Sequence, residues 1–160
     1  MITLMLGNLN SGISHVMGLL ASEESRCTGR KIYSNAPFVY DFEQIDLASI
    51  DKLENSVIAL DHVSDFLTVG REMSVESMKI FVSVAFADRR NNSVFFTLSK
   101  TFPVDPHFVR YCDFLVESMV TTDNVILFTI SDLHTSESQD FIMDLSIEDK
   151  ILSYSFEQEP

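Results

Sequence analysis

Eight residues near the start of the chain, positions 7–14, have the glycine spacing of a loop that binds phosphate. In the pattern G-x-x-x-x-G-K-[ST], backbone amides surround a phosphate group, the lysine ammonium contacts its oxygens, and the final hydroxyl holds Mg²⁺. Gly7, Gly12 and Ser14 fit this pattern, whereas Ile13 occupies the position of the lysine. The spacing therefore predicts a phosphate-binding backbone without its mobile cation. The residues expected to line it are Gly7, Asn8, Asn10, Ser11, Gly12, Ile13, Ser14 and His15.

A second candidate motif, residues 56–61, is an apolar run that ends in a carboxylate. It predicts a buried parallel strand with Asp61 at its carboxyl end. In a nucleotide-binding α/β sheet that position faces the phosphate loop, so we expect Asp61 to lie beside the amides of residues 8–14. There it would share a Mg²⁺ ion with Ser14.

Other arrangements that could support catalysis or metal binding are missing from the sequence. It contains no C-x-x-C, H-x-x-x-H or H-E-x-x-H spacing, so it predicts no metal site of those kinds. No serine lies in a G-x-S-x-G context. Cys27 and Cys112 are too few for a disulfide framework, and we expect both thiols to be reduced.

Length and composition indicate one globular domain over residues 1–160. Hydrophobic residues make up 46% of the chain, and a chain of this length buries about 70% of the surface that its unfolded form exposes. No apolar stretch approaches the roughly 18 residues of a membrane span, and the first residues lack the basic segment of a signal peptide. We therefore expect neither a membrane span nor a cleaved leader.

The net charge is −13, from 24 acidic and 11 basic residues. Direct binding of nucleic acid depends on contacts from Lys and Arg to phosphate, so this charge argues against such binding by the bare monomer. We expect nucleic acid to be handled only through an assembly.

The order of hydrophobic patterns and breaks predicts alternating strands and helices. Strands are expected at residues 1–6, 31–35, 57–61, 93–98, 114–116 and 124–130, and helices at 13–24, 46–53, 78–87 and 105–111. This alternation predicts a mostly parallel sheet with helices on both faces and an antiparallel hairpin at its C-terminal edge. In the tail, residues 141–145 are expected to be helical and residues 151–156 to form an edge strand.

Two helices of this set carry particular signals. Gly29 follows the first helix and is expected to end it. Ser74 precedes the third and is expected to cap its free amides. The third helix has apolar residues three or four positions apart, which predicts its buried face. These residues are Met78, Phe81, Val82, Ala85 and Phe86.

Taken in order, these motifs resemble the small P-loop ATPases of archaeal viruses, phages and plasmids, which are related to zonular-occludens-toxin-like assembly proteins and to FtsK/HerA-type DNA pumps. The resemblance rests on residues 7–14, 32–35, 57–61, 66–67, 71, 87–91, 95–98, 104–106, 110 and 113–114. It implies a RecA/ASCE-like three-layer sandwich with a motif-bearing core over residues 1–118 and an extension over 119–160. It also implies ATP and Mg²⁺ as ligands, with Ser14 and Asp61 at the metal.

The resemblance also shows three departures from the family's catalytic pattern. Ile13 replaces the Walker A lysine, His62 replaces the Walker B glutamate that activates water, and Ser99 lies close to the position of a glutamine that senses the γ-phosphate. Catalytic roles fall to Asp61, His62 and Arg71, the last as an arginine supplied across a subunit interface. Further candidates are Arg89, Arg90 and Arg110 for that arginine, and His15 or Lys100 for a replacement cation.

Together these residues predict a degenerate ATPase-fold protein of a virus or mobile element, with weak or absent hydrolysis. Its expected role is genome packaging, virion assembly or DNA translocation. Two alternatives stay open: a slow but genuine ATPase motor, and a virion-associated or regulatory interaction protein that binds no nucleotide. We expect a homo-oligomer or a partner of an intact ATPase, in the host cytoplasm or in the virion.

Overall fold

The computed structural model describes residues 1–8, 11–37, 41–64, 74–101, 103–122, 124–145 and 150–153. The elements in chain order are β1 (Ile2–Gly7), α1 (Ile13–Thr28), β2 (Lys31–Ser34), β3 (Glu43–Gln44), the 3₁₀ helix η1 (Leu47–Lys52), β4 (Ser56–Leu60), α3 (Val75–Ala85), β5 (Ser93–Ser99), α4 (Pro106–Val109), β6 (Phe114–Thr122), β7 (Val125–Asp132), β8 (Ser138–Asp144) and β9 (Lys150–Ser153).

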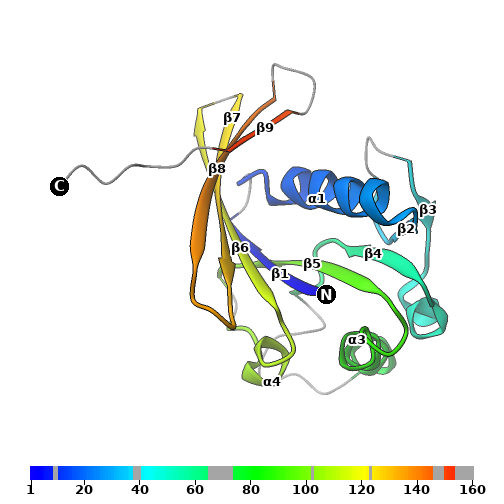
Figure 1. Ribbon diagram of the computed structural model, residues 1–160. Helices are drawn as coiled ribbons and strands as arrows, with labels where there is room; N and C mark the ends of the chain where they lie inside the picture. The colour runs from blue at the N-terminus through cyan, green and yellow to red at the C-terminus, as the bar shows by residue number, and fades with distance from the viewer. Residues whose placement is uncertain are drawn as a thin grey trace.

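Within these described residues, nine strands form one sheet in the order β3-β2-β4-β5-β1-β6-β7-β8-β9 (Figure 1). The pairs from β3 to β6 are parallel, and those from β6 to β9 are antiparallel. This confirms the predicted mostly parallel sheet with antiparallel strands at its C-terminal edge. The two motif strands, β1 and β4, are not direct neighbours, because β5 lies between them. Since all three strands are parallel, their carboxyl ends still meet at one edge of the sheet.

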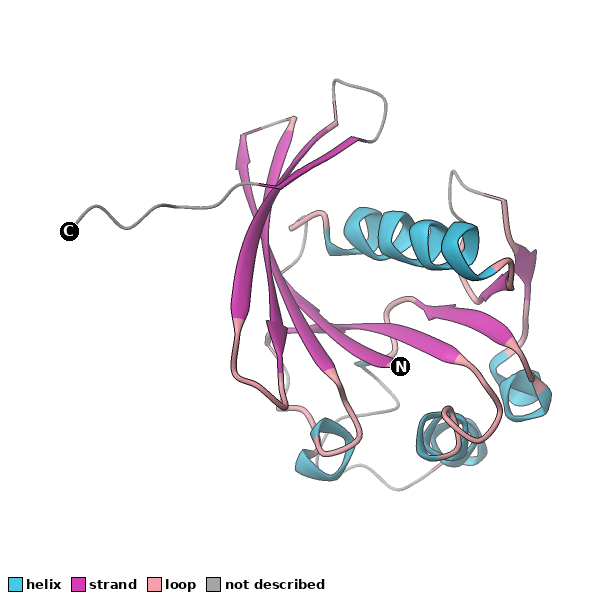
Figure 2. Cartoon of the chain, in the orientation of Figure 1, coloured by secondary structure: helices cyan, strands magenta, loops and turns pink. Residues whose placement is uncertain are grey.

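Helices cover both faces of the parallel part of the sheet (Figure 2). On one face, α1 packs through residues such as Met17 against Phe95 and its neighbours. On the other face, η1, α3 and α4 contribute Ile50, Ile80 and Phe108 to a second apolar cluster. The arrangement is the predicted three-layer sandwich.

Local signals set the helix ends. Gly29 terminates α1 in the left-handed conformation, with φ at 70°, although α1 continues to Thr28, beyond the predicted end at residue 24. The Ser74 hydroxyl accepts a hydrogen bond from the Ser77 backbone N–H at 3.1 Å and so caps α3, as predicted. Asp105 caps α4 in the same way, and Pro106 occupies its first turn.

The predicted helix over residues 141–145 is wrong. Most of this segment belongs to β8, which pairs with β7 along its length. Phe141 and Met143 face the α1 side and join the apolar cluster there, so the long-range pairing and burial override the local helical pattern. The edge strand predicted over residues 151–156 occurs as β9, Lys150–Ser153, and residues 154–156 lie outside the described residues. The expected hairpin is therefore part of a larger antiparallel extension, in which β6 also runs well past the predicted residues 114–116.

The predicted buried face of α3 is wrong for Met78 and Phe86, whereas Phe81 packs against the core cluster as predicted. Ser77, Ile80 and Val84 face the core, whereas Met78 and Phe86 are 53% and 39% exposed. The helix carries two apolar stripes on different sides, and only one of them can face the sheet. Packing against η1 and the sheet selects the stripe that the sequence pattern did not indicate.

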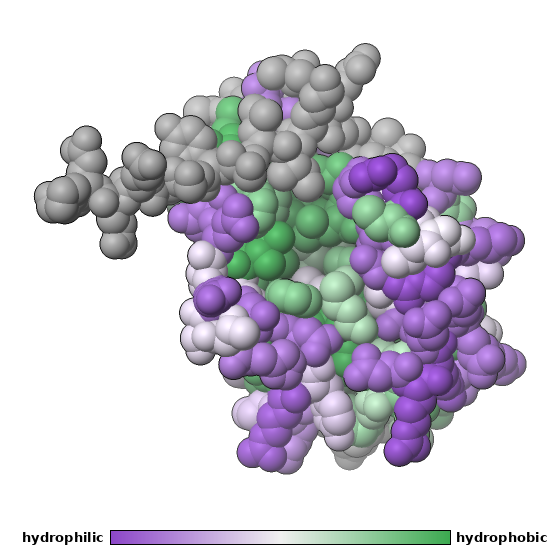
Figure 3. All heavy atoms as spheres, in the orientation of Figure 1, coloured by the Kyte–Doolittle hydropathy of each residue, from purple (hydrophilic) through white to green (hydrophobic). Residues whose placement is uncertain are grey.

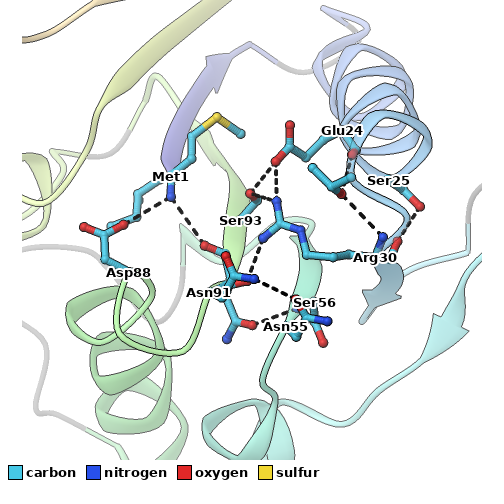
Figure 4. Close-up of polar contacts among 12 residues, drawn as sticks. Met1, Glu24, Ser25, Arg30, Asn55, Ser56, Asp88, Asn91 and Ser93 are labelled. Carbon is cyan, nitrogen blue, oxygen red and sulfur yellow. Dashed lines mark hydrogen bonds and ion pairs between the residues drawn. The ribbon is translucent and has the colours of Figure 1, made fainter.

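A partly buried ion pair joins the end of α1 to the start of β5 (Figure 4). The Arg30 guanidinium contacts the Glu24 carboxylate, and its side chain is only 10% exposed. Arg30 also donates hydrogen bonds to Ser93 Oγ at 2.7 Å and to the Asn91 carbonyl at 2.6 Å. Because the pair has these extra partners, the cost of its desolvation is offset and α1 is held against the sheet.

Between α1 and strands β6 and β7 the surface is apolar and hollowed (Figure 3). The apolar side chains that line the hollow include Met1, Leu20, Phe95, Phe114, Val116 and Ile130. No helix in the described part of the chain is both long and apolar enough to cross a membrane.

The substitution Gly12→Ala is expected to destabilise the protein more than Gly29→Ala. Both glycines have a positive φ, 73° and 70°, so each alanine costs about 1–2 kcal/mol of backbone strain. A Cβ at position 12 would also lie 2.3 Å from Ile126 Cδ1, whereas a Cβ at position 29 meets nothing within 4 Å. In urea unfolding, Gly12→Ala should lower the free energy of unfolding by about 1 kcal/mol or more beyond Gly29→Ala. Equal losses would contradict the close contact with Ile126.

Candidate functional site

The phosphate-loop motif connects β1 to α1 at the carboxyl edge of the parallel strands. Gly12 immediately precedes α1 and has φ 73° and ψ 9°. The Ser11 backbone N–H donates to the Asn8 carbonyl at 3.0 Å, and the predicted lining residue Asn10 lies outside the described residues. Because Gly12 has no side chain to cap α1, the first amides of the helix are left for an anion or water.

Packing alone requires both glycines of the motif. A Cβ at Gly7 would lie 2.1 Å from Ser11 Oγ and 2.8 Å from Ile13 Cβ, and a Cβ at Gly12 would lie 2.3 Å from Ile126 Cδ1. Ile126 belongs to β7, so the antiparallel extension contacts the loop directly. Ser118 of β6 adds a hydrogen bond to Ser11 Oγ at 3.1 Å.

Ile13, at the lysine position, is part of the hydrophobic core. Its side chain is 6% exposed and belongs to the apolar cluster under α1, together with Met5 and Val16. It also forms part of the wall of the neighbouring cavity. The position that would carry a mobile ammonium therefore presents only hydrocarbon.

Asp61 lies in contact with the loop segment, as expected from the sequence. Its Oδ1 atom accepts a hydrogen bond from Ser14 Oγ at 2.9 Å and another from Thr97 Oγ1 at 2.5 Å. The carboxylate is buried and joins the first turn of α1 to the ends of β4 and β5. Hydroxyl donors of this kind stabilise a carboxylate that has lost its water.

Two residues from segments that carry the resemblance, but that the sequence analysis did not assign to the site, hold Asp61 in place. Asn35, just after β2, accepts from the Asp61 backbone N–H at 2.7 Å and donates to the Asp61 carbonyl at 2.9 Å. Thr97 also accepts from the His62 backbone N–H at 2.8 Å. Their positions at the carboxyl ends of predicted strands were the available signal, but the strand order was needed to bring them to Asp61.

His62 has a backbone conformation that is uncommon outside glycine. Its φ is 54°, and such conformations cluster at functional sites. The imidazole is 77% exposed, and its Nε2 lies 3.6 Å from Asp61 Oδ2. His62 therefore borders the carboxylate without being buried with it.

A cavity of about 290 Å³ opens between the loop and the ends of β4 and β5. Its described lining residues are Gly7, Asn8, Ser11, Gly12, Ile13, Ser14, His15, His62, Thr97, Leu98 and Ser99. These include two histidines but no lysine or arginine. The volume is at the lower end of the roughly 300–1,000 Å³ of small-molecule sites.

Ser99 ends β5 and lies in the cavity wall. Its backbone N–H donates to Ser64 Oγ at 2.9 Å, and its hydroxyl donates to Thr101 Oγ1 at 2.9 Å. The neighbouring Lys100 ammonium pairs with Glu117 Oε1 at 2.8 Å. Lys100, which the sequence analysis gave as a candidate replacement for the Walker A lysine, is therefore already paired with a carboxylate.

The candidate arginines are spread over other parts of the molecule. Arg71 lies outside the described residues. Arg89 and Arg90 precede β5, and Arg110 follows α4 and precedes β6. Residues before parallel strands lie at the amino edge of a sheet, opposite the cavity, so these three can reach a phosphate site only on another subunit.

The residues present fit some parts of a nucleotide better than others. A serine hydroxyl beside a carboxylate, Ser14 and Asp61, suits Mg²⁺, which binds through a few protein oxygens and keeps several waters. No group of three or more potential metal-ligating His, Cys, Asp or Glu side chains occurs in the described ranges. The glycine bend fits a phosphate group, whereas the buried Ile13 does not fit the charge of a triphosphate.

Comparison with known proteins identifies the fold. No protein-family model matches the sequence, and no curated protein does. Among solved structures, the chain is similar to the genome packaging NTPase B204 from Sulfolobus turreted icosahedral virus 2 in complex with ATP-gammaS, with a TM-score of 0.64, 8% identity, and coverage of 87% of this chain and 95% of that one. The chain has the fold of a P-loop NTPase.

Two further structures are similar to this P-loop NTPase fold. The N-terminal domain of zonular occludens toxin from Neisseria meningitidis has a TM-score of 0.54 at 11% identity, over 98% of this chain and 94% of that one. The KaiC-like protein PH0186 from Pyrococcus horikoshii OT3 has a TM-score of 0.61 at 9% identity, over 96% and 89%. The resemblance to small viral P-loop ATPases inferred from the sequence is thus confirmed for the fold.

Thr97→Val is expected to destabilise the protein more than Thr97→Ser. Valine keeps the shape of threonine but removes one of the two hydroxyl donors to Asp61 Oδ1 and the acceptor of the His62 N–H, at a cost of about 1–3 kcal/mol. Serine keeps the hydroxyl and loses one methyl group, at about 0.8 kcal/mol. Urea unfolding of both variants measures the difference, and a valine variant as stable as the serine variant would contradict this role of Thr97.

Proposed function

We propose that this protein is a degenerate P-loop ATPase of a virus or mobile element, which binds nucleotide weakly and hydrolyses it slowly or not at all. The observation that carries the proposal is the buried Ile13 in the position of the Walker A lysine. A charge-assisted hydrogen bond from lysine is worth about 1.5–3 kcal/mol, and more in a transition state that develops charge. The apolar side chain provides none of this.

The retained parts of the site support residual binding of nucleotide. Gly7 and Gly12 form the bend, and Ser14, which lines the cavity, contacts the buried Asp61 carboxylate. The similar NTPase B204 has been solved in complex with ATP-gammaS, AMPPCP and AMP. On this basis ATP and Mg²⁺ are the proposed ligands, with Ser14 and Asp61 as the residues that would hold the metal.

The proposed role is genome packaging, virion assembly or DNA translocation. It rests on the fold shared with the genome packaging NTPase B204 and with the zonular occludens toxin domain. A net charge of −13 makes contact with nucleic acid dependent on an assembly, either of several copies or with an intact ATPase. The proposed location is the host cytoplasm or the virion.

A slow but genuine ATPase is the second candidate, and the intact Ser14–Asp61 contact favours it. His62 would serve as the base, since it stands where the water-activating glutamate is expected. Arg71, or one of Arg89, Arg90 and Arg110, would come from a neighbouring subunit, where such an arginine contributes about 10³–10⁵ in rate.

An interaction protein without nucleotide is the third candidate, because the core needs the two glycines even without a ligand.

Thermal unfolding with and without Mg·ATP tests the proposal. A ligand that binds only the native state stabilises it, by about 1.4 kcal/mol at tenfold excess over its Kd. We expect a small upward shift of the midpoint at millimolar ATP, reduced in Ser14→Ala. The absence of any shift would leave the interaction protein as the remaining candidate, and release of phosphate at a steady rate would favour the slow ATPase.

Replacing Ile13 by lysine is expected to lower the stability of the free protein and to raise its response to ATP. The ammonium must leave the core cluster, at the cost of buried apolar area, but it then reaches the cavity. Ile13→Met is the matched control, because methionine has a side chain about as long as that of lysine but carries no charge. A larger ATP-induced shift for the lysine variant than for the methionine variant is expected, and equal shifts would mean that the pocket differs from a phosphate site in more than this residue.

Adding His62→Glu to Ile13→Lys should then raise the rate of hydrolysis.

A further inference from the structure

Two strands of the antiparallel extension run past the end of β1 and lie beside the phosphate loop (Figure 1). Gly7, the last residue of β1, pairs with Ser118 of β6. Because β6 continues to Thr122 and β7 begins at Val125, the end of β6 and the start of β7 extend beyond this last pair with β1. The loop that follows Gly7 therefore has these two strands on one side.

The first contact between the extension and the loop is a hydrogen bond between two buried serines. Ser118 Oγ donates to Ser11 Oγ at 3.1 Å, and the two residues are 6% and 7% exposed. The Ser11 backbone N–H also donates to the Asn8 carbonyl at 3.0 Å, so Ser11 is held through both its main chain and its side chain. Since Ser11 lines the cavity, the hydrogen bond joins β6 to the cavity wall.

The second contact joins Ile126 of β7 to the backbone of Gly12. A Cβ at position 12 would lie 2.3 Å from Ile126 Cδ1 and 2.8 Å from its Cγ1, so the isoleucine lies directly against the Gly12 Cα atom. Ile126 is 1% exposed and belongs to the apolar cluster under α1. The backbone at Gly12 therefore cannot shift toward β7 without displacing a closely packed side chain. Because Gly12 leads directly into α1, this contact also fixes where the first amides of the helix lie.

The position of the loop backbone matters for binding because the described lining of the cavity offers no lysine or arginine. Ile13, in the lysine position, is buried in the core. A phosphate group in the cavity would therefore depend on backbone N–H groups and on the Ser14 hydroxyl. Donors of this kind stabilise a ligand most when they are already in position, since no free energy is then lost in ordering the loop.

We propose that Ser118 and Ile126 are positioning residues of the candidate site, which hold the phosphate loop in the conformation that binds an anion. Ser118 acts through Ser11, and Ile126 acts through Gly12. Neither is among the described residues that line the cavity, so neither touches the ligand itself. The inference rests on the nucleotide binding proposed above, and it gives the β6–β7 hairpin a role in that binding.

Titration with Mg·ATP, followed by NMR chemical shifts at a temperature where every variant stays folded, tests the role of Ser118. Ser118→Ala removes the hydrogen bond and is expected to raise the Kd about threefold to tenfold. Ser118→Thr keeps a hydroxyl and is expected to bind with a Kd close to that of the wild type. Ser131→Ala is the matched control, because Ser131 Oγ forms a serine–serine hydrogen bond with Ser138 Oγ at 2.8 Å in the same extension. Ser131 lies opposite Leu115, near the start of β6, so its replacement should leave the Kd unchanged.

The same titration tests the role of Ile126. Ile126→Val removes the Cδ1 methyl group that lies nearest to Gly12 and gives the loop room to move. The Kd is expected to rise about threefold or more, because only part of the population then has the binding conformation. Ile130→Val is the matched control, since it removes the same methyl group from the same strand. Ile130 lines the apolar hollow between α1 and strands β6 and β7, and its replacement should leave the Kd unchanged.

Three results would overturn this role of Ser118 and Ile126. If the wild type binds ATP and both Ser118→Ala and Ile126→Val bind it with an unchanged Kd, the two residues serve only the fold, while the proposed nucleotide binding stands. If the control variants, or Ser118→Thr, bind as weakly as the test variants, the effect follows general destabilisation and not the position of the loop. A wild type that binds no ATP at millimolar concentration would overturn the proposed nucleotide binding together with this role.

Discussion

The buried carboxylate of Asp61 is the interaction on which the candidate site depends. It accepts hydrogen bonds from Ser14 at the start of α1 and from Thr97 on β5, while Asn35 after β2 binds its backbone on both sides. One residue thereby joins the loop to three strands of the sheet. A buried carboxylate without such donors would be strongly destabilising, so the site and the local fold support each other. The geometry holds Ser14 and Asp61, the pair proposed to bind the metal, in contact although Ile13 stands in the position of the lysine.

The loop also has a structural role that is separate from nucleotide. Any side chain at Gly7 or Gly12 would collide with Ser11, Ile13 or Ile126, and Ile13 itself fills the core under α1. Folding by itself therefore requires these glycines, whether or not nucleotide binds. The degenerate site proposed above would thus keep its glycine bend while Ile13 stands in the position of the lysine. The loop also connects the antiparallel extension to the site, because Ile126 and Ser118 come from that extension.

The cavity lies at the carboxyl edge of the parallel strands. The acidic character of the chain, with a net charge of −13, disfavours direct contact with nucleic acid.

The sequence by itself determined the features that depend on neighbouring residues. These are the buried runs of β1 and β4, the helix ends at Gly29 and Ser74, and the glycine bend, because capping and backbone conformation are local properties. Only the tertiary structure decided which stripe of α3 is buried, that residues 141–145 pair as a strand, and that Asn35 and Thr97 meet at Asp61. Each of these depends on which strands lie side by side. Local patterns leave two apolar faces or two backbone conformations close in free energy, and the contacts made across the sheet select between them.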